Sequence, residues 1–205
     1  MSVLPPDPLA GLPDRVRLPM AFDPAPLAAE LAAFGEEEWV RHFVRSNYEG
    51  EWSVIPLRAA AGETHPVRMI GTHPLAASFV DTIYLDRAPA VRGLLASLDC
   101  PLKAARLMRL TPGSRILEHE DHDPDAENGS GTARLHLPIT TNDDVEFLLN
   151  RRPVAMRPGE LWYLRLSEPH AVANRGATDR VHLVIEVRLN DWLLALLGEG
   201  ARAAA

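Results

Sequence analysis

The stretch from Ala133 to Ile139, Ala-Arg-Leu-His-Leu-Pro-Ile, alternates polar and apolar side chains, as a β-strand with one buried face does. Similar short segments recur on both sides of it, at 103–110, 115–118, 145–149, 161–166 and 180–189. Turn-forming pairs separate these segments, among them Pro112-Gly113, Asn128-Gly129, Asn142-Asp143 and Pro158-Gly159. Strands with this regular spacing predict an all-β sandwich or barrel for the C-terminal half of the chain.

The first hundred residues have a different pattern. Apolar residues at helical spacing follow two prolines, which predicts a helix over about 23–34, and a second helical stretch is expected within 76–98. Residues 46–56 and 59–74 contain glycine and proline and are expected to form loops. A short alternating run at 15–18 is a candidate edge strand.

These elements are expected to form a single domain over residues 1–205. A helical and loop layer (1–100) would pack on a β core (101–190). A helix that starts at Asp191 and ends at Gly198 would be followed by an alanine-rich tail, together making up residues 191–205.

The composition excludes several classes of partner. A hydrophobic content of 46% with 24% charged residues is that of a globular protein. The net charge of -7 argues against nucleic acid or an anionic membrane as the main partner. No apolar stretch approaches the roughly 18 residues that a membrane helix needs, and the N-terminus does not resemble a secretory signal. Cys100 is the only cysteine, which leaves no intrachain disulfide or thiolate zinc site, and a cytoplasmic location is expected.

Two metal-ligand residue types stand two positions apart in His119-Glu120-Asp121. In an extended segment residues i and i+2 share a face, so His119 and Asp121 should converge while Glu120 points away. His170 is the best candidate for a third ligand from another strand. Two histidines and one carboxylate leave open positions on an iron ion for a bidentate 2-oxo acid and O2, a pattern typical of non-haem Fe(II) oxygenases. Arg180 could pair with the distal carboxylate of 2-oxoglutarate.

Each of these residues also has an ordinary structural interpretation. The segment around His119 could be a solvated acidic turn, His170 a loop histidine and Arg180 a surface residue in an ion pair. The order of the four residues within a β-sandwich favours the iron and 2-oxoglutarate interpretation.

Further polar residues adjoin the candidate site in the sequence. Alternation places Arg134 and His136 on one face of their strand, where they could hold an anion if the opposite face packs on the outer core; a half-exposed edge strand is the alternative. His122, Asp123 and His182 are ligand-type residues, yet we expect each to be structural or solvated. From its residue type alone, Trp52 is expected to be part of the core.

The stretch from Arg106 to Leu189 resembles the aspartyl/asparaginyl β-hydroxylase family, which includes bacterial free-proline hydroxylases. The segments that carry the resemblance are Glu118-His-Glu-Asp, Ala133-Arg-Leu-His-Leu-Pro-Ile, Pro158-Gly-Glu-Leu-Trp-Tyr-Leu, Pro169-His-Ala-Val-Ala-Asn and Arg180-Val-His-Leu, with Glu51-Trp-Ser further upstream. The resemblance implies a mainly β fold, the double-stranded β-helix (jelly-roll, cupin-like), with the N-terminal helices packed on it. It also implies the use of Fe(II), 2-oxoglutarate and O2.

The resemblance further assigns roles to residues. It implies that His119 and His170 bind iron, that Arg180 grips 2-oxoglutarate with help from Arg134 and His136, and that Trp52 lines the same pocket. The animal peptidyl β-hydroxylases lack a carboxylate ligand, whereas Asp121 stands at the position that the bacterial amino-acid hydroxylases use.

Three functional hypotheses follow. The first is hydroxylation of a free or carrier-held amino acid with release of succinate and CO2, favoured by Asp121. The second is hydroxylation of Asp or Asn within a peptide. The third is a cupin-like metal protein without redox chemistry, such as an isomerase or sensor, which would have no need for Arg180 ten residues past its last ligand.

Overall fold

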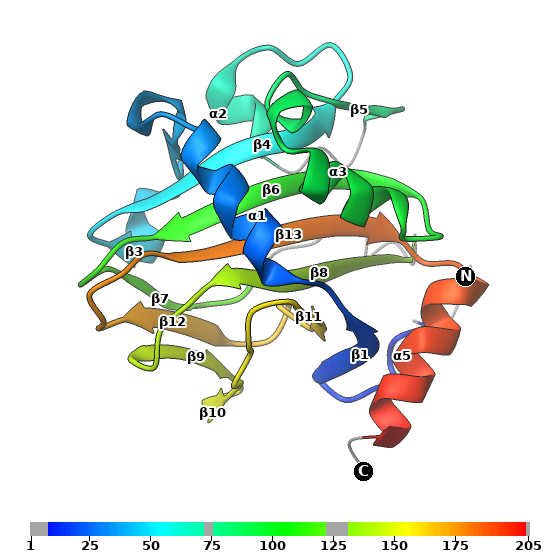
Figure 1. The fold of residues 1–205 in the computed structure, drawn as a ribbon. Coiled ribbons are helices and arrows are strands. Elements are labelled where there is room, and N and C mark those ends of the chain that lie inside the picture. Colours follow the sequence, from blue (N-terminus) through cyan, green and yellow to red (C-terminus); the bar gives the residue numbers. More distant parts are fainter. Residues whose placement is uncertain (1–7, 72–75, 122–130, 204–205) are drawn as a thin grey trace, which may run out of the picture.

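Two antiparallel β-sheets face each other in the computed structural model, which describes residues 8–71, 76–121 and 131–203 (Figure 1). The strands of the larger sheet are β1 (Arg15–Ala21), β2 (Val40–Arg41), β4 (Trp52–Ala60), β5 (Phe79–Asp81), β6 (Leu102–Leu110), β8 (Thr132–Thr140), β11 (Glu160–Leu164) and β13 (Arg180–Arg188). The strands of the smaller sheet are β3 (Tyr48–Glu49), β7 (Arg115–His119), β9 (Val145–Leu149), β10 (Arg152–Pro153) and β12 (His170–Asn174).

The strand orders are those of a jelly roll. In the larger sheet the order is β1-β11-β8-β13-β6-β4-β2, with β5 paired to β4, and in the smaller sheet it is β10-β9-β12-β7-β3. From β6 to β13 the chain passes back and forth between the two sheets, except at β9 and β10, which are paired in the smaller sheet. The predicted double-stranded β-helix is confirmed.

Strand β13 lies between β6 and β8, and its two faces differ in character. One face joins the main apolar core through Val181, Leu183, Ile185 and Val187. The opposite face carries Arg180, His182, Val184 and Glu186, all buried. Period-two alternation in this one strand thus separates a structural face from a polar face directed toward the smaller sheet.

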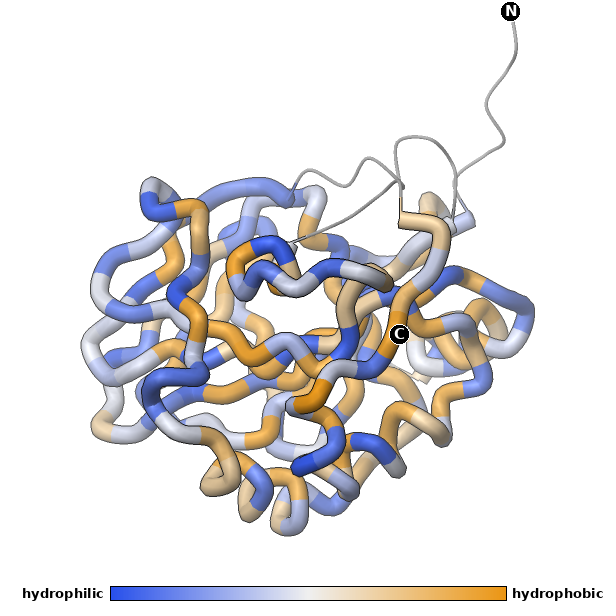
Figure 2. The backbone as a smooth tube through the Cα atoms, turned by 90° about the horizontal axis from the view of Figure 1, so that it is seen from above, coloured by the Kyte–Doolittle hydropathy of each residue, from blue (hydrophilic) through white to orange (hydrophobic). Residues whose placement is uncertain are grey.

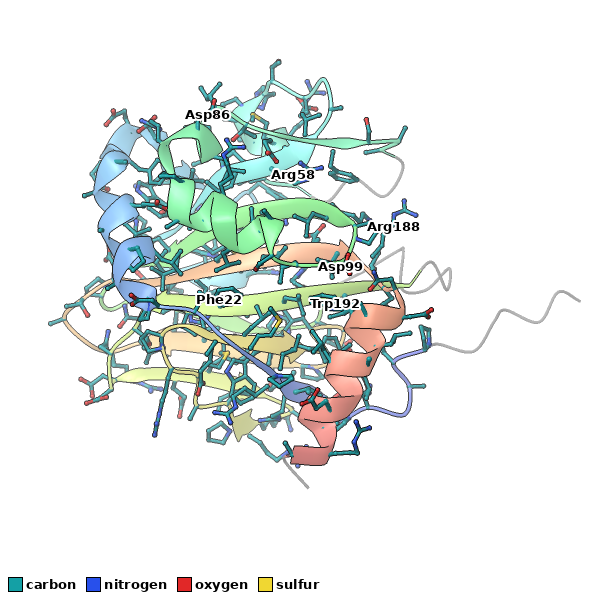
Figure 3. All side chains as sticks on the ribbon, turned by 45° about the vertical axis from the view of Figure 1, so that its right-hand side comes forward. Phe22, Arg58, Asp86, Asp99, Arg188 and Trp192 are labelled. Carbon is teal, nitrogen blue, oxygen red and sulfur yellow. The ribbon has the colours of Figure 1, made fainter. Side chains whose placement is uncertain are left out.

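Helices cover the outer face of the larger sheet (Figure 1). They are α1 (Pro24–Glu30), α3 (Pro89–Ala96) and α5 (Asp191–Ala203), and a further turn, α2 (Pro66–Met69), packs near β4. Helices α1, α3 and α5 each contribute leucines to the core that contains the outer face of β13, and the partly buried Trp192 packs there from α5 (Figure 3). Figure 2 shows hydrophobic segments gathered in the interior and hydrophilic ones at the turns around it. None of the described helices is long and apolar enough to cross a membrane.

Three expectations from the sequence are wrong in detail. Residues 46–56 are not a loop, because β4 begins at Trp52 and supplies a buried strand to the larger sheet. The first hundred residues therefore contribute strands as well as helices. Helix α5 runs through Gly198 to Ala203. A Cβ atom at Gly200 would lie 2.3 Å from the carbonyl oxygen of Arg17, so this glycine allows the helix to approach β1 closely.

Candidate functional site

A cavity of about 400 Å³ lies between the two sheets. Its walls are inner-face residues of β4, β6, β8 and β13 on one side and of β7, β9 and β12 on the other. Phe43, which is 49% exposed, is among the lining residues and marks where the cavity opens to solvent. A cavity of this size suits a small organic ligand.

The three predicted metal ligands lie together at this cavity. His119 ends β7 and His170 begins β12, and the two are paired across the antiparallel ladder with ring centroids 4.3 Å apart. Asp121 follows β7, and its backbone N–H donates to the carbonyl of Leu166 at 2.8 Å. One potential ligand atom from each of the three lies within 4.8 Å of the others, which is the spacing of a metal site.

The two histidines are oriented by backbone carbonyls. Nδ1 of His119 lies 2.7 Å from the carbonyl oxygen of Leu117, and Nδ1 of His170 lies 3.0 Å from that of Glu168. A carbonyl can only accept, so each Nδ1 carries a proton, and in the neutral ring each Nε2 presents a lone pair. Both Nε2 atoms face Oδ1 of Asp121, at 3.4 and 3.9 Å. This arrangement is how metal-binding histidines are usually held.

The Asp121 carboxylate is shared between the histidines and a cation. Its Oδ2 accepts a hydrogen bond from Nη1 of Arg134, whose Nη2 lies 3.3 Å from Oε1 of Glu186. Burial raises the pKa of Asp121, but Arg134 and the two histidines outweigh it and hold that pKa well below its usual value. Asp121 is therefore ionised at neutral pH. Arg134, expected from the resemblance to assist the co-substrate, contacts the carboxylate of the proposed metal ligand.

The buried polar atoms that lack a partner gather around the same cavity. Among the described residues, the buried side-chain atoms without a hydrogen bond are Nε1 of Trp52, Nε of Arg106, both ring nitrogens of His136 and Nε of Arg180. All four residues line the cavity. Burying such groups unpaired is costly, and nearly all of these atoms are donors. These donors suit a ligand that is rich in hydrogen-bond acceptors, such as a carboxylate.

One aromatic ring, that of Phe147, lies close to both Arg180 and the candidate metal ligand His170. Cζ of Arg180 is 5.9 Å from the ring centroid of Phe147, which stacks on His170 at 6.4 Å and 8°. Burial lowers the pKa of Arg180 to about 9, so the guanidinium keeps its charge at neutral pH. Burial, reinforced by Arg180, also holds the pKa of His136 well below its usual value, so this imidazole is neutral.

The other predicted residues have the following positions. Arg134 and His136 line the cavity while Leu135 and Leu137 pack in the outer core, as the alternation predicts. Trp52 is buried and stacks on His42 with centroids 3.7 Å apart. His182 was expected to be structural or solvated; it is buried and contacts Arg180 through a hydrogen bond.

The remaining expectations concern the neighbours of Asp121 in the sequence. Glu120, expected to point away from the ligands, is exposed and also lines the cavity. His122 and Asp123 lie outside the described residues.

Three residues of the site were not singled out from the sequence. Arg106 lines the cavity from β6, donating to Oε1 of Glu186 at 2.7 Å and to the carbonyl of Gly71 at 2.6 Å. His42 covers Trp52, and burial lowers the pKa of His42 to about 4. The alternation of Arg106, Met108 and Leu110 along β6 could have indicated Arg106; nothing local in the sequence points to Glu186 or His42.

Comparison with known protein sequences finds a matching family and a related hydroxylase. A family model described as aspartyl/asparaginyl beta-hydroxylase matches residues 26–189. An L-proline cis-4-hydroxylase of Rhizobium meliloti (strain 1021) is 26% identical over 168 residues. That match covers 80% of this chain but 57% of the relative, so the chain spans little more than half of that protein's length.

Solved structures resemble the fold. A prolyl-4-hydroxylase of Pseudomonas putida matches with a TM-score of 0.50 and 16% identity, covering 90% of this chain and 96% of that one. An oxidoreductase of the 2OG-Fe(II) oxygenase family from Burkholderia pseudomallei matches with a TM-score of 0.48 and 18% identity, covering 81% and 79%. At these identities the likeness to the Pseudomonas protein shows a common fold.

Proposed function

Because the chain belongs to the aspartyl/asparaginyl β-hydroxylase family, we propose that it is an Fe(II)- and 2-oxoglutarate-dependent dioxygenase that hydroxylates an unactivated C–H bond of an amino acid. His119, Asp121 and His170 would hold the iron, and Arg180 would bind the distal carboxylate of 2-oxoglutarate. The observation that carries the proposal is the His-Asp-His cluster beside a cavity that also contains a buried guanidinium.

The residues present fit this metal. Two Nε2 lone pairs and one ionised carboxylate oxygen converge from β7, β12 and the segment after β7. Three protein ligands of this kind leave coordination positions open for a keto acid and O2. When bound, Fe(II) with 2-oxoglutarate and O2 supplies the oxidising power for hydroxylation, and succinate and CO2 are the co-products.

The protein's own groups would orient the co-substrate. Arg180 provides the charge for one carboxylate. The indole N–H of Trp52 has no hydrogen-bond partner within the part of the chain that the structure describes, and neutral His136 has one N–H donor and one acceptor nitrogen. Apolar side chains such as Met108, Phe147 and Val184 complete the wall and exclude water from the site.

For the substrate we propose a free amino acid. Arg106 is a second buried guanidinium on the cavity wall, and its Nε–H has no partner among the described residues. The Nη atoms of Arg106 are engaged by Glu186 and by the carbonyl of Gly71. With Arg180 assigned to 2-oxoglutarate, the Nε–H of Arg106 is the donor that we assign to the carboxylate of a substrate. A free α-carboxylate satisfies it, whereas an amino acid held on a carrier as a thioester has none. The name of the proline hydroxylase relative supports the same class.

The test is succinate release by the Fe(II)-loaded protein under air, measured against the twenty amino acids and a set of Asp- and Asn-containing peptides. We expect at least one free amino acid to stimulate succinate release. The Arg106→Ala variant should raise the KM for that amino acid. Stimulation by peptides alone would favour the peptidyl β-hydroxylase alternative. Tight zinc binding without any affinity for 2-oxoglutarate would favour a non-redox cupin-like protein.

A further inference from the structure

Arg180 differs from the other buried arginines of the described chain in the kind of partner that holds it. Arg106 and Arg109 each donate to a carboxylate at 2.7 Å. The side-chain hydrogen bond of Arg180 runs instead from Nη2 to Nδ1 of His182, at 2.8 Å. No carboxylate of the described residues forms an ion pair with Arg180, so its charge is left uncompensated by the part of the protein that the structure describes.

The histidine in this contact is neutral. A guanidinium has no acceptor, so Nδ1 of His182 must accept and the ring proton lies on Nε2. His182 is only 2% exposed, and its burial, together with the charge of Arg180, holds its pKa well below the usual value. A neutral acceptor can fix the direction of a guanidinium without cancelling its charge, which a carboxylate in the same place could not do.

The position of His182 separates it from the ligand. It stands two residues beyond Arg180 on the same face of β13, between Met108 of β6 and Pro138 of β8. Its ring lies 6.0 Å from that of His136, at 75°. Arg180 and His136 line the cavity, whereas His182 does not. Any influence of His182 on a bound ligand therefore passes through a neighbouring residue.

We propose that His182 is a positioning residue that aims the guanidinium of Arg180 at the distal carboxylate of 2-oxoglutarate while leaving its full charge to that ligand. This inference rests on the proposed function. It predicts that His182 affects recognition of the distal carboxylate specifically, and that an acid at this position is harmful even though it would bind Arg180 more strongly.

The experiment compares two ligands that differ in the carboxylate alone. Binding of 2-oxoglutarate and of 2-oxopentanoate, which ends in a methyl group instead, is measured by calorimetry on the Fe(II)-loaded protein under argon. The variants are His182→Asn, which keeps a neutral acceptor near the place of Nδ1, His182→Phe, which keeps a ring without an acceptor, and His182→Asp. Thermal unfolding checks that each variant is folded; if His182→Phe is not, the Asn and Asp variants decide.

We expect His182→Phe to weaken 2-oxoglutarate binding at least about tenfold, the range for losing a hydrogen bond to a charged group, and to leave 2-oxopentanoate binding unchanged. His182→Asp should also lose affinity for 2-oxoglutarate, and His182→Asn should retain it. Equal losses for both ligands, unchanged binding in His182→Phe, or wild-type affinity in His182→Asp would overturn the inference. A wild-type protein that binds 2-oxoglutarate no better than 2-oxopentanoate would instead refute the proposed function, and the inference with it.

Discussion

Replacing Arg180 with alanine removes the cation that we assign to 2-oxoglutarate. The side chain is buried at the start of β13, on the cavity wall, and no carboxylate of the described residues is paired with it. The expected result is a large rise in the KM for 2-oxoglutarate with little change in the KM for the substrate. Arg180→Lys should recover only part of the loss, because a single ammonium replaces a planar two-donor group.

The size of the effect follows from the burial. An exposed ion pair would be worth less than about 1 kcal/mol. Arg180 is 3% exposed and already desolvated, so its pair with a carboxylate belongs with buried hydrogen bonds to charged groups, about 1.5–3 kcal/mol each. Two such bonds that are not fully additive give about 2–4 kcal/mol, or roughly 30- to 1000-fold in KM.

The assay is succinate release as a function of 2-oxoglutarate concentration. Arg188→Ala is the matched control, since Arg188 ends the same strand and is exposed at the edge of the molecule (Figure 3). It should behave as wild type. A 2-oxoglutarate KM in Arg180→Ala within a factor of about three of wild type would refute the reasoning, because it corresponds to less than about 0.7 kcal/mol.

Other changes have equally definite outcomes. Asp121→Ala should lose most Fe(II) binding and turnover while the neighbouring Glu120→Ala keeps its iron, as measured by metal analysis after gel filtration; an iron-loaded, active Asp121→Ala would place the protein with hydroxylases that use two histidines alone. Burial raises the pKa of the Cys100 thiol to about 11, so alkylation by iodoacetamide at pH 8 should be much slower in the folded protein than in urea, and should accelerate as the pH rises toward 11; equal rates at pH 8 would contradict this. Leu137→Ala should lower the free energy of unfolding by about 2–5 kcal/mol in urea denaturation, because this fully buried residue sits in the main core; a loss below about 1 kcal/mol would contradict the assignment.

The C-terminal strands could be predicted because their sequence signals are local. Segment 145–149 is a strand with the predicted bounds, and β13 differs from its prediction by one residue. Strand β4 was missed because it contains Pro56, a residue that central strands rarely hold. The structure accommodates the proline beside a register shift between Pro56 and Arg58 in the pairing with β6. Such an irregularity depends on the partner strand and leaves no local signal.

Some residues of the candidate site could likewise be predicted from the sequence, and others could not. His119, Asp121, His170 and Arg180 could be proposed from residue type and spacing, because metal and carboxylate chemistry restricts the choice of side chains. The alternation along β6 places Arg106 on the same face as Met108 and Leu110, but it does not show that Arg106 belongs to the site. The position of the Arg106 side chain depends on its contact with Glu186, eighty residues away in the chain. Only the folded sheet brings these two residues together.

The most direct test of the central claim is a titration of the metal-free protein with Fe(II) under argon, followed by addition of 2-oxoglutarate. The account predicts about one Fe(II) per chain, a weak visible absorption band that appears only when 2-oxoglutarate is added, and loss of both in Asp121→Ala. Iron bound at this stoichiometry without any band or measurable affinity for 2-oxoglutarate would contradict it, as would iron binding that survives Asp121→Ala unchanged.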